Sequence, residues 1–316
     1  MVSPVPLATY EAQRATLALL LATLAWGCSF TWAKAGGAAL NQAAGLPPGA
    51  LLGPLLLLTW RFTLAGVLWL LCFPAARRGW TWRSVGRAAL LGCLLCLGLT
   101  VQMLGLDRTS EAVNAFLTSL AVVFVPLIML GVLRRPPPLA MWCAVLLATV
   151  GVWLMTGATP TGFGGGEGLG LACALFFAVH MIALGELGQR DSPWRLAAGQ
   201  FLSVGLGAGS SCLLLDYDLS MLLPARQWQL MTSAGVWLDG LLLVGVSTML
   251  AFGLMFYFQP VLDPTRAALL YLAEPVFAAL FAYIVAGRGL SVLALSGAVL
   301  LVMANGLAEL LARRGA

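Results

Sequence analysis

The sequence predicts an all-α membrane protein with ten transmembrane helices arranged as two inverted five-helix repeats. Three observations lead to this prediction. Hydrophobic residues make up 61% of the 316 residues and charged residues only 9%, whereas soluble domains carry about 25% charged residues. Apolar stretches of roughly 20 residues, the length that spans a bilayer, recur along the whole chain. The second half of the chain also repeats features of the first half.

The internal repeat is clearest in the fourth and ninth apolar stretches. A shift of 156 residues places Thr109 on Thr265 and Thr118 on Glu274. The sequence AVLL at 144–147 recurs further along the chain, where a two-residue deletion explains its slightly different offset. Because each copy has an odd number of helices, the second copy must enter the membrane in the opposite sense. The pattern therefore predicts an inverted-topology repeat.

The ten expected spans follow the apolar stretches in order. They cover residues 15–36, 50–73, 87–106, 109–133, 138–157, 167–187, 196–215, 236–259, 264–286 and 290–311. The first repeat then occupies residues 15–158 and the second repeat residues 167–312. A glycine-rich linker at 159–166 joins them, and residues 1–14 and 313–316 form short tails.

Basic residues predict the orientation, because the cytoplasmic loops of membrane proteins are enriched in Arg and Lys. With both termini in the cytoplasm, 12 of the 17 basic residues fall on the cytoplasmic side. These are Arg14, Arg77, Arg78, Arg83, Arg87, Arg134, Arg135, Arg190, Arg195, Arg266, Arg313 and Arg314. We therefore expect a multi-pass protein of the inner (plasma) membrane. A net charge of +5 could suggest a nucleic-acid partner, but the positions of the basic residues matter more than their sum, and we expect no nucleic-acid partner.

The sequence carries no cluster typical of an enzyme or a metal site. A Ser-His-Asp triad would have to use His180, the only histidine, which lies in an apolar span. Cys93 and Cys96 form a C-x-x-C pair with no second pair and no nearby histidine, so we interpret them as small buried residues. We expect no enzymatic activity, no metal and no cofactor.

Glu274 is the strongest functional candidate. It lies midway along the ninth span, about 15 Å from the helix end in a hydrocarbon core about 30 Å thick. An ionisable group at that depth is costly unless it faces a cavity or a partner. The adjacent Pro275 removes a backbone donor and is expected to kink the helix.

Other polar residues complete the expected substrate cavity. Asn114 and Thr118 are four residues apart and share one helix face, while Tyr271 and Glu274 are expected to share the corresponding face of the other repeat. The predicted cavity residues are Trp26, Trp32, Lys34, Asn114, Thr118, Tyr271 and Glu274.

Three charged or titratable residues have two interpretations each. Lys34, the only lysine, either lines the pathway or extends to the outer headgroups from its helix end. Arg61 forms a structural ion pair or helix-end contact, with Glu274 as the acid to test, or it binds a substrate carboxylate. His180 is a proton-relay candidate, with packing in an apolar helix as the alternative.

Taken together, these motifs resemble the EamA branch of the drug/metabolite transporter superfamily, over nearly the whole chain. The matching motifs are Trp26-Gly27 with Phe30 and Lys34, Arg61-Phe62 with Ala65, LDRTSEAVNAFLTSLAVVFVPLI in the fourth span, and Ala273-Glu274-Pro275-Val276. The resemblance implies a ten-helix fold of two EamA repeats, a central cavity, alternating access and export of amino acids, metabolites or toxic compounds. The chain departs from the family in having Gly287-Arg288-Gly289 where an acid commonly follows the ninth span.

The sequence and the resemblance together predict an exporter of small metabolites, such as amino acids or related amphiphiles. We expect a small-molecule substrate, the lipid bilayer as surroundings, and a monomer. Two alternatives stay open: uptake of a cofactor or nutrient on the same fold, and a membrane scaffold or receptor that does not transport. A transporter predicts a hydrated cavity reaching Glu274, whereas a scaffold predicts a filled interior.

Overall fold

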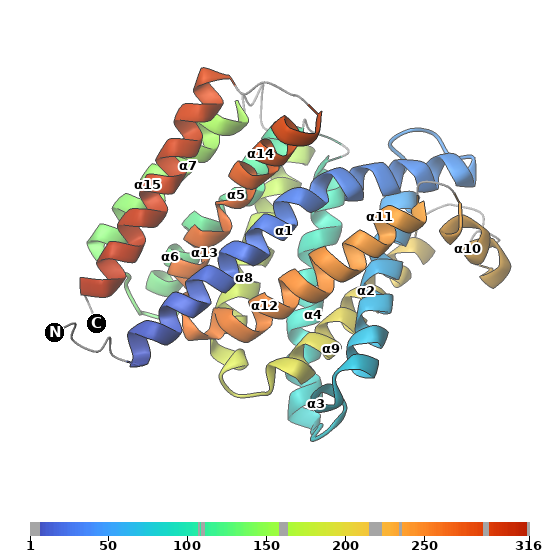
Figure 1. Cartoon of the computed structure of the whole chain (residues 1–316), viewed down its shortest axis with the longest axis horizontal. Helices are drawn as coiled ribbons and strands as arrows, with labels where there is room; N and C mark the ends of the chain where they lie inside the picture. Colours follow the sequence, from blue (N-terminus) through green and yellow to red (C-terminus); the bar gives the residue numbers. More distant parts are fainter. Residues whose placement is uncertain are drawn as a thin grey trace.

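Every regular element in the described part of the chain is a helix (Figure 1). The structure, a computed structural model, describes residues 7–106, 108, 111–157, 164–214, 223–233, 236–286 and 291–314. Residues 1–6, Thr109, most of the linker (159–163), Gly287-Arg288-Gly289 and residues 315–316 lie outside these ranges.

The helices follow one another along the whole described chain. The long helices and their connecting turns are α1 (Leu7–Ala44), α2 (Leu52–Cys72), α3 (Pro74–Arg77), α4 (Trp82–Leu106), α5 (Glu111–Ser119), α6 (Ala121–Gly131), α7 (Leu139–Thr156), α8 (Gly165–Gly188) and α9 (Pro193–Leu213). They continue as α10 (Pro224–Met231), α11 (Val236–Leu242), the π-helix η2 (Leu243–Leu250), α12 (Ala251–Phe258), the 3₁₀-helix η3 (Gln259–Val261), α13 (Pro264–Tyr271), α14 (Glu274–Ala286) and α15 (Val292–Arg314).

Seven helical stretches in the described residues are long and apolar enough to cross a membrane. They are Tyr10–Ala44, Leu52–Cys72, Trp82–Gly105, Val113–Gly131, Gly165–Gly188, Pro193–Leu213 and Val236–Val261. Two shorter apolar helices, Met141–Thr156 and Val292–Ala308, accompany them. The prediction of an all-α membrane protein is confirmed at this level.

Helices from the two halves of the chain pack against each other in matching pairs. The second span, α2, packs on the seventh, α9, and the fifth span, α7, packs on the last helix, α15, beside which it lies in Figure 1. Likewise α1 packs on α13 and α14, and α8 packs on α5 and α6. The bundle therefore interleaves the two halves.

The first helix is longer than predicted. α1 runs over 38 residues, whereas the apolar pattern predicted a span over 15–36. The flanking sequences are rich in Ala, Leu, Glu and Gln, which favour helix, so the helix continues past the apolar stretch at both ends. Lys34 consequently lies inside α1 and not at its end, which removes the helix-end position that one interpretation of Lys34 assumed.

The ninth span is broken, so the expectation of one continuous helix over 264–286 is wrong. α13 ends at Tyr271 and α14 begins at Glu274. Pro275 is in the first turn of α14, where a missing backbone N–H costs nothing because that turn has no intrahelical acceptor. Proline thus sets a new helix start in place of the predicted kink. Tyr271 and Glu274 lie on two helices and do not share one helix face.

Two other spans depart from regular α-helix. The fourth span divides at Leu120, between α5 and α6. The eighth span contains η2, in which the backbone bonds follow the wider π pattern, a geometry that often occurs at functional sites. Both irregularities lie near the middle of their spans. They release backbone carbonyls from the regular hydrogen-bond ladder.

We predict that Gly297→Ala destabilises the α7–α15 pair. A Cβ at Gly297 would lie 2.9 Å from Met155 Cα and would also overlap the carbonyl oxygen of Gly151. Such overpacking costs about 1–3 kcal/mol. Thermal denaturation of the purified protein in detergent measures the loss. Gly306→Ala on the same helix is the matched control, because its Cβ meets nothing within 4 Å. Equal melting temperatures for the two variants would contradict the prediction.

Candidate functional site

Seven residues from both halves of the chain form a polar and aromatic cluster. They are Trp26, Arg61, Ser247, Thr248, Phe252, Tyr271 and Glu274, which we call the central cluster. They come from α1, α2, η2, α12, α13 and α14. Residues more than 180 positions apart in the sequence are thereby brought together.

The carbonyl oxygen of Ser247 is the centre of the polar contacts. Trp26 Nε1 donates to it at 3.0 Å, and Arg61 Nη2 approaches it at 3.5 Å. In a regular α-helix this oxygen would accept from Ala251, but the Ala251 N–H bonds to the carbonyls of Thr248 and Val246. The π-helical turn therefore leaves the Ser247 carbonyl available to side chains of the other half.

Arg61 is held by two hydroxyl groups of η2. Its Nε donates to Thr248 Oγ1 at 2.6 Å and its Nη2 to Ser247 Oγ at 2.7 Å. The guanidinium carbon also lies 5.1 Å from the centroid of the Phe62 ring, a cation–π distance. These contacts stabilise a charge that would otherwise be costly at this depth.

Aromatic rings form the other side of the central cluster. The Trp26 ring lies 4.9 Å from Phe252 and 5.5 Å from Tyr271 between centroids. The Tyr271 hydroxyl donates to Gln259 Oε1 at 2.8 Å, and Gln259 Nε2 donates to the Met181 carbonyl at 2.7 Å. This relay of bonds fixes the orientation of the Tyr271 ring next to Trp26.

Glu274 enters the cluster at the first turn of α14. A Cβ on Gly27 would lie 2.9 Å from the Glu274 carbonyl oxygen and 2.8 Å from the Ala278 nitrogen, so glycine lets α1 lie directly against this turn. Trp26 directly precedes Gly27 on α1. The partial positive charge of a helix N-terminus favours a carboxylate there.

The charges of Arg61 and Glu274 interact electrostatically, as the sequence led us to test. Arg61 nevertheless directs its hydrogen bonds at Thr248 and Ser247. Among the described residues, Glu274 accepts no side-chain hydrogen bond and forms no direct ion pair. Its carboxylate therefore has neighbouring positive charge, but no residue in the described part of the chain donates to it.

The remaining predicted cavity residues lie apart from this cluster. Thr118 Oγ1 donates to the Asn114 carbonyl at 2.8 Å within α5, and Thr118 is within hydrogen-bonding reach of Cys173 on α8. Asn114 is buried, and its Nδ2 lacks a partner in the described residues. No described contact joins either residue to the central cluster.

Trp32 and Lys34 lie further along α1. The Trp32 ring meets Phe281 of α14 edge to face, with centroids 6.3 Å apart. Lys34 is exposed. Both residues follow Trp26 toward the far end of α1.

His180 is buried between α8 and α9. Its Nε2 lies 2.8 Å from Gln200 Oε1, and Gln200 is fully buried. Its described polar partner is thus a neutral amide, which favours the packing interpretation.

Sequence reasoning missed three members of the central cluster: Ser247, Thr248 and Phe252. Two adjacent hydroxyls in an otherwise apolar span were the available signal, since polar side chains within a membrane helix usually bond across helices. The π-helical turn that exposes the Ser247 carbonyl left no comparable mark in the sequence.

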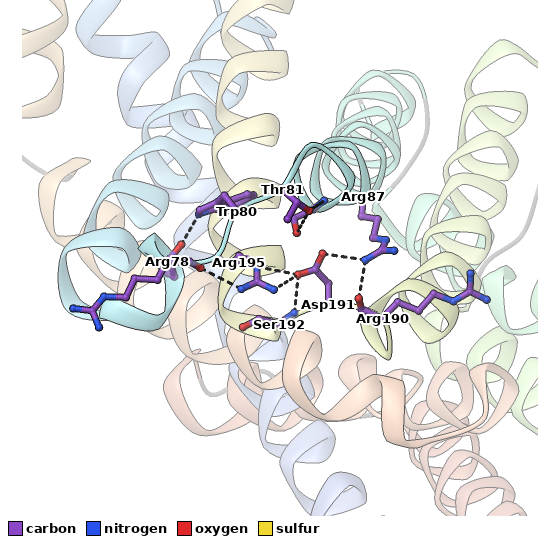
Figure 2. A network of polar contacts seen from close by, with 10 residues as sticks. Arg78, Trp80, Thr81, Arg87, Arg190, Asp191, Ser192 and Arg195 are labelled. Atoms are coloured by element: carbon purple, nitrogen blue, oxygen red, sulfur yellow. Dashed lines mark hydrogen bonds and ion pairs between the residues drawn. The ribbon is translucent and has the colours of Figure 1, made fainter.

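A second polar network lies where α8 and α9 are joined, on the end of the bundle at which α1 begins and α15 ends (Figures 1 and 2). We call this end the terminal face. Asp191 is its centre, with a side chain only 1% exposed. It pairs with Arg195 at 2.7 Å and with Arg87 of α4 at 3.2 Å. The Ser192 N–H donates to it at 2.8 Å.

The same arginines extend the network to backbone carbonyls. Arg195 Nη1 donates to the Arg78 carbonyl at 3.2 Å, and Arg87 Nη1 to the Arg190 carbonyl at 2.7 Å. Figure 2 shows both arginines directed at the carboxylate of Asp191 from opposite sides. The turn between α8 and α9 is thereby tied to α4 and to the segment after α3.

The environment of Asp191 favours its ionised form. Burial by itself would raise the pKa of Asp191, but hydrogen bonds from Ser84, Arg195 and the Ser192 N–H, with the charge of Arg195, outweigh burial. The pKa of Asp191 therefore lies below its ordinary value. This carboxylate stays charged through the neutral range.

A cavity of about 410 Å³ also opens on the terminal face. Its walls include Arg135, Glu186, Gln189, Asp263 and Pro264. Arg135 and Glu186 form an ion pair, and Gln189 Nε2 donates to the Pro260 carbonyl at 3.1 Å. Asp263 caps α13 by accepting from the Thr265 N–H at 2.8 Å. The cavity thus lies at one end of α13, and the central cluster lies at its other end.

A charged and aromatic cluster inside a bundle of helices long and apolar enough to cross a membrane is typical of polytopic membrane transporters. The chain belongs to the EamA-like transporter family, whose model matches residues 164–308. A protein of Archaeoglobus fulgidus described as an uncharacterized transporter is 30% identical over 226 residues, or 70% of this chain and 76% of that protein. The chain is accordingly a transporter-family member and not an enzyme.

Other comparisons extend the similarity over nearly the whole chain. A further uncharacterized transporter of Archaeoglobus fulgidus is 28% identical over 290 residues, covering 92% of this chain and 84% of that protein. One solved crystal structure matches with a TM-score of 0.70 at 21% identity, covering 96% of this chain and 98% of that chain. That match supports the fold alone.

We predict that Arg61 and Glu274 stabilise each other. Arg61→Gln removes the positive charge near Glu274 and should destabilise the protein by about 3–5 kcal/mol, the usual effect of leaving one buried charge uncompensated. Adding Glu274→Gln should recover part of that loss, because no lone charge is then left. Thermal denaturation of both single variants and the double variant gives the coupling free energy, expected at about 1–3 kcal/mol. Strictly additive effects would show that the two charges do not interact.

We also predict a pH-dependent contribution from Asp191. Asp191→Asn should lower the free energy of unfolding at pH 7 by about 1–3 kcal/mol, because buried donors of Arg195 and Arg87 lose a charged acceptor. Since folding lowers the pKa of Asp191, this contribution is complete above the unfolded pKa of about 3.9 and is lost as pH falls through the lower folded value.

Melting curves of both proteins between pH 7 and pH 3 measure this effect. The gap between them should be constant near neutrality and should narrow below about pH 4. Glu186→Gln is the comparison, since that side chain is 38% exposed and its pairs should matter less. A gap that widens toward acid would contradict the assignment.

Proposed function

We propose that this protein exports small metabolites, such as amino acids or related amphiphiles, by alternating access between two inverted five-helix repeats. The observation that carries the proposal is the central cluster. A carboxylate to which none of the described residues donates, a positioned arginine and three aromatic rings come together on helices of both halves. Intramembrane ionisable residues commonly mark substrate pathways.

The packing of the helices supports two inverted repeats. Seven long helices, two shorter ones and the broken segment 264–286 make ten apolar segments. The contacts of one half correspond to those of the other half. The helix α1 packs on α13 and α14 in the same way as α8 packs on α5 and α6. The fourth and ninth segments are both broken. Broken helices at a repeat interface are where transporters bind substrates and ions.

Contacts at the two ends of the bundle support alternating access. On the terminal face, Arg87–Asp191 and Arg135–Glu186 join the first half to the second. At the other end, Trp60 Nε1 donates to Gln227 Oε1 at 2.6 Å. Opening either end requires its contacts to separate, so the two sets define two alternative gates.

The terminal face carries the arginine-rich connections, the start of α1 and the end of α15, and we propose that it is the cytoplasmic side of the inner membrane. The cavity beside Asp263 is then the cytoplasmic entrance, with α13 linking it to Tyr271. Trp26, Phe252, Tyr271 and Glu274 would contact the substrate. Trp32, Lys34, Asn114 and Thr118 would line other parts of the pathway of a monomer.

Counterflow in proteoliposomes tests the proposal. The purified protein is reconstituted with unlabelled amino acid inside, no ion gradient is imposed, and uptake of labelled neutral, aromatic and basic amino acids is followed. We expect exchange of at least one class and at least about a tenfold loss in Glu274→Gln. Glu11→Gln, which alters an exposed acid at the start of α1, should exchange normally.

Absence of exchange for every amino acid by folded protein would overturn the proposed substrate. A panel of cofactors would then test uptake of a nutrient, and failure there would favour the scaffold. Exchange that survives Glu274→Gln would retain transport but remove Glu274 from the cycle.

A further inference from the structure

We propose that the loop between α2 and α4 binds the phosphate group of an anionic phospholipid in the leaflet beside it. This loop, residues 73–83, is called the basic loop below. It carries Arg77, Arg78 and Arg83, together with Trp82. The inference goes beyond the proposed function, because it concerns a lipid partner at the surface of the bundle and is independent of what the central cluster binds.

The basic loop is placed at the level of the lipid headgroups. It connects two candidate membrane spans, Leu52–Cys72 and Trp82–Gly105, so both of its ends lead into apolar helices. Leu71 is 63% exposed and Trp82 is 91% exposed, so these side chains face the surroundings of the bundle. Tryptophan is enriched where the hydrocarbon core meets the headgroups. The arginines of the loop are therefore expected at the depth of the phospholipid phosphates.

The positive charge of the basic loop is not balanced by the carboxylate next to it. Asp191 has a side chain only 1% exposed, and it already pairs with one arginine of α9 and one of α4. The side chains of Arg77, Arg78 and Arg83 are exposed, and within the described ranges none of them forms a hydrogen bond or an ion pair. Three guanidinium groups thus remain for an anionic ligand. Arginine is well suited to phosphate, which it binds through two parallel N–H bonds.

The Asp191 network fixes the backbone of the basic loop. Arg195, held by Asp191, donates from Nη1 to the Arg78 carbonyl at 3.2 Å. Gly79 has a φ of +72° and leaves room for this contact, because a Cβ there would lie 2.9 Å from the same Nη1 atom. Figure 2 shows the Arg78 side chain directed away from Asp191. The contact that holds the Arg78 carbonyl therefore leaves its guanidinium outside the network.

Local hydrogen bonds order the rest of the loop. Trp80 Nε1 donates to the Ala76 carbonyl at 2.7 Å. The Ser84 N–H donates to Thr81 Oγ1 at 3.1 Å at the start of α4. A binding surface that is ordered before the ligand arrives loses less conformational entropy on binding. The basic loop is thus a prepared surface and not only a run of basic residues.

The test compares three ligands that share or lack a negative phosphate. Phosphatidylglycerol is an anionic lipid, phosphatidylcholine is a lipid without net charge, and glycerol 3-phosphate is a soluble phosphate ester without acyl chains. Binding to the full-length protein in a neutral detergent is measured as a ligand-dependent rise in melting temperature. We expect phosphatidylglycerol alone to raise it, and high salt to reduce the rise because salt screens exposed charges.

Variants assign the effect to the basic loop. Arg78→Gln combined with Arg83→Gln should bind phosphatidylglycerol about tenfold or more weakly, since each arginine near a membrane surface contributes a factor of about five. The matched control removes two exposed arginines elsewhere on the terminal face, Arg14→Gln with Arg134→Gln. It should bind phosphatidylglycerol like the unmodified protein. Each variant is compared with its own melting temperature without lipid, so a general loss of stability is not mistaken for lost binding.

Three outcomes would each overturn the lipid site. An equal rise with phosphatidylcholine would indicate a general effect of lipid, and an equal rise with glycerol 3-phosphate would indicate a site for soluble phosphates. An equal loss in the two double variants would indicate general surface charge. A loss confined to Arg78→Gln with Arg83→Gln would support the site, whether or not counterflow is observed.

Discussion

A carboxyl group in the interior of a membrane bundle is the constraint on which the other central features depend. Glu274 is tolerated because α14 begins at this residue, which places the carboxylate at the positive end of a helix. The helix start that follows the break and the guanidinium of Arg61 both lower the cost of a charge there, and Gly27 lets α1 lie against the same turn. Each of them also shapes the space around it. The same features that stabilise Glu274 therefore create the site.

Arg61 connects this charge to the irregular backbone of the eighth span. Its bonds to Ser247 and Thr248 join α2 of the first half to η2 of the second half, and Trp26 makes a parallel link from α1. In a regular α-helix, the carbonyl oxygen of Ser247 would accept a hydrogen bond from a backbone N–H of the same helix. Any relative movement of the two halves must strain or exchange these bonds, together with the ion pairs of Asp191 and Glu186 on the terminal face.

Sequence reasoning predicted the class and the most important residue but not the arrangement of the site. Glu274 was singled out by one carboxylate in a long apolar run, and the membership of the chain in the EamA-like family was anticipated from motifs and confirmed by comparison. Tyr271 and Glu274 were expected on one helix face, which is wrong because the helix restarts at Glu274. Thr118 instead faces Cys173 of α8, and the Asn114 side chain lies against Gly105 of α4. A single break in a helix decides which residues share a face, and the local sequence gives only a weak indication of where that break falls.

The sequence by itself determined that this protein lies in a membrane and which of its charged residues fall inside the apolar spans. Apolar stretches long enough to span a bilayer, with few charges, indicate membrane helices, because an α-helix bonds its backbone groups within the segment. Tertiary structure decided which groups meet. Trp26 and Ser247 are 221 residues apart, and Arg61 and Thr248 are 187 apart. Those contacts exist because two halves pack across one another and a π-helical turn turns a carbonyl outward, neither of which follows from the residues of one span alone.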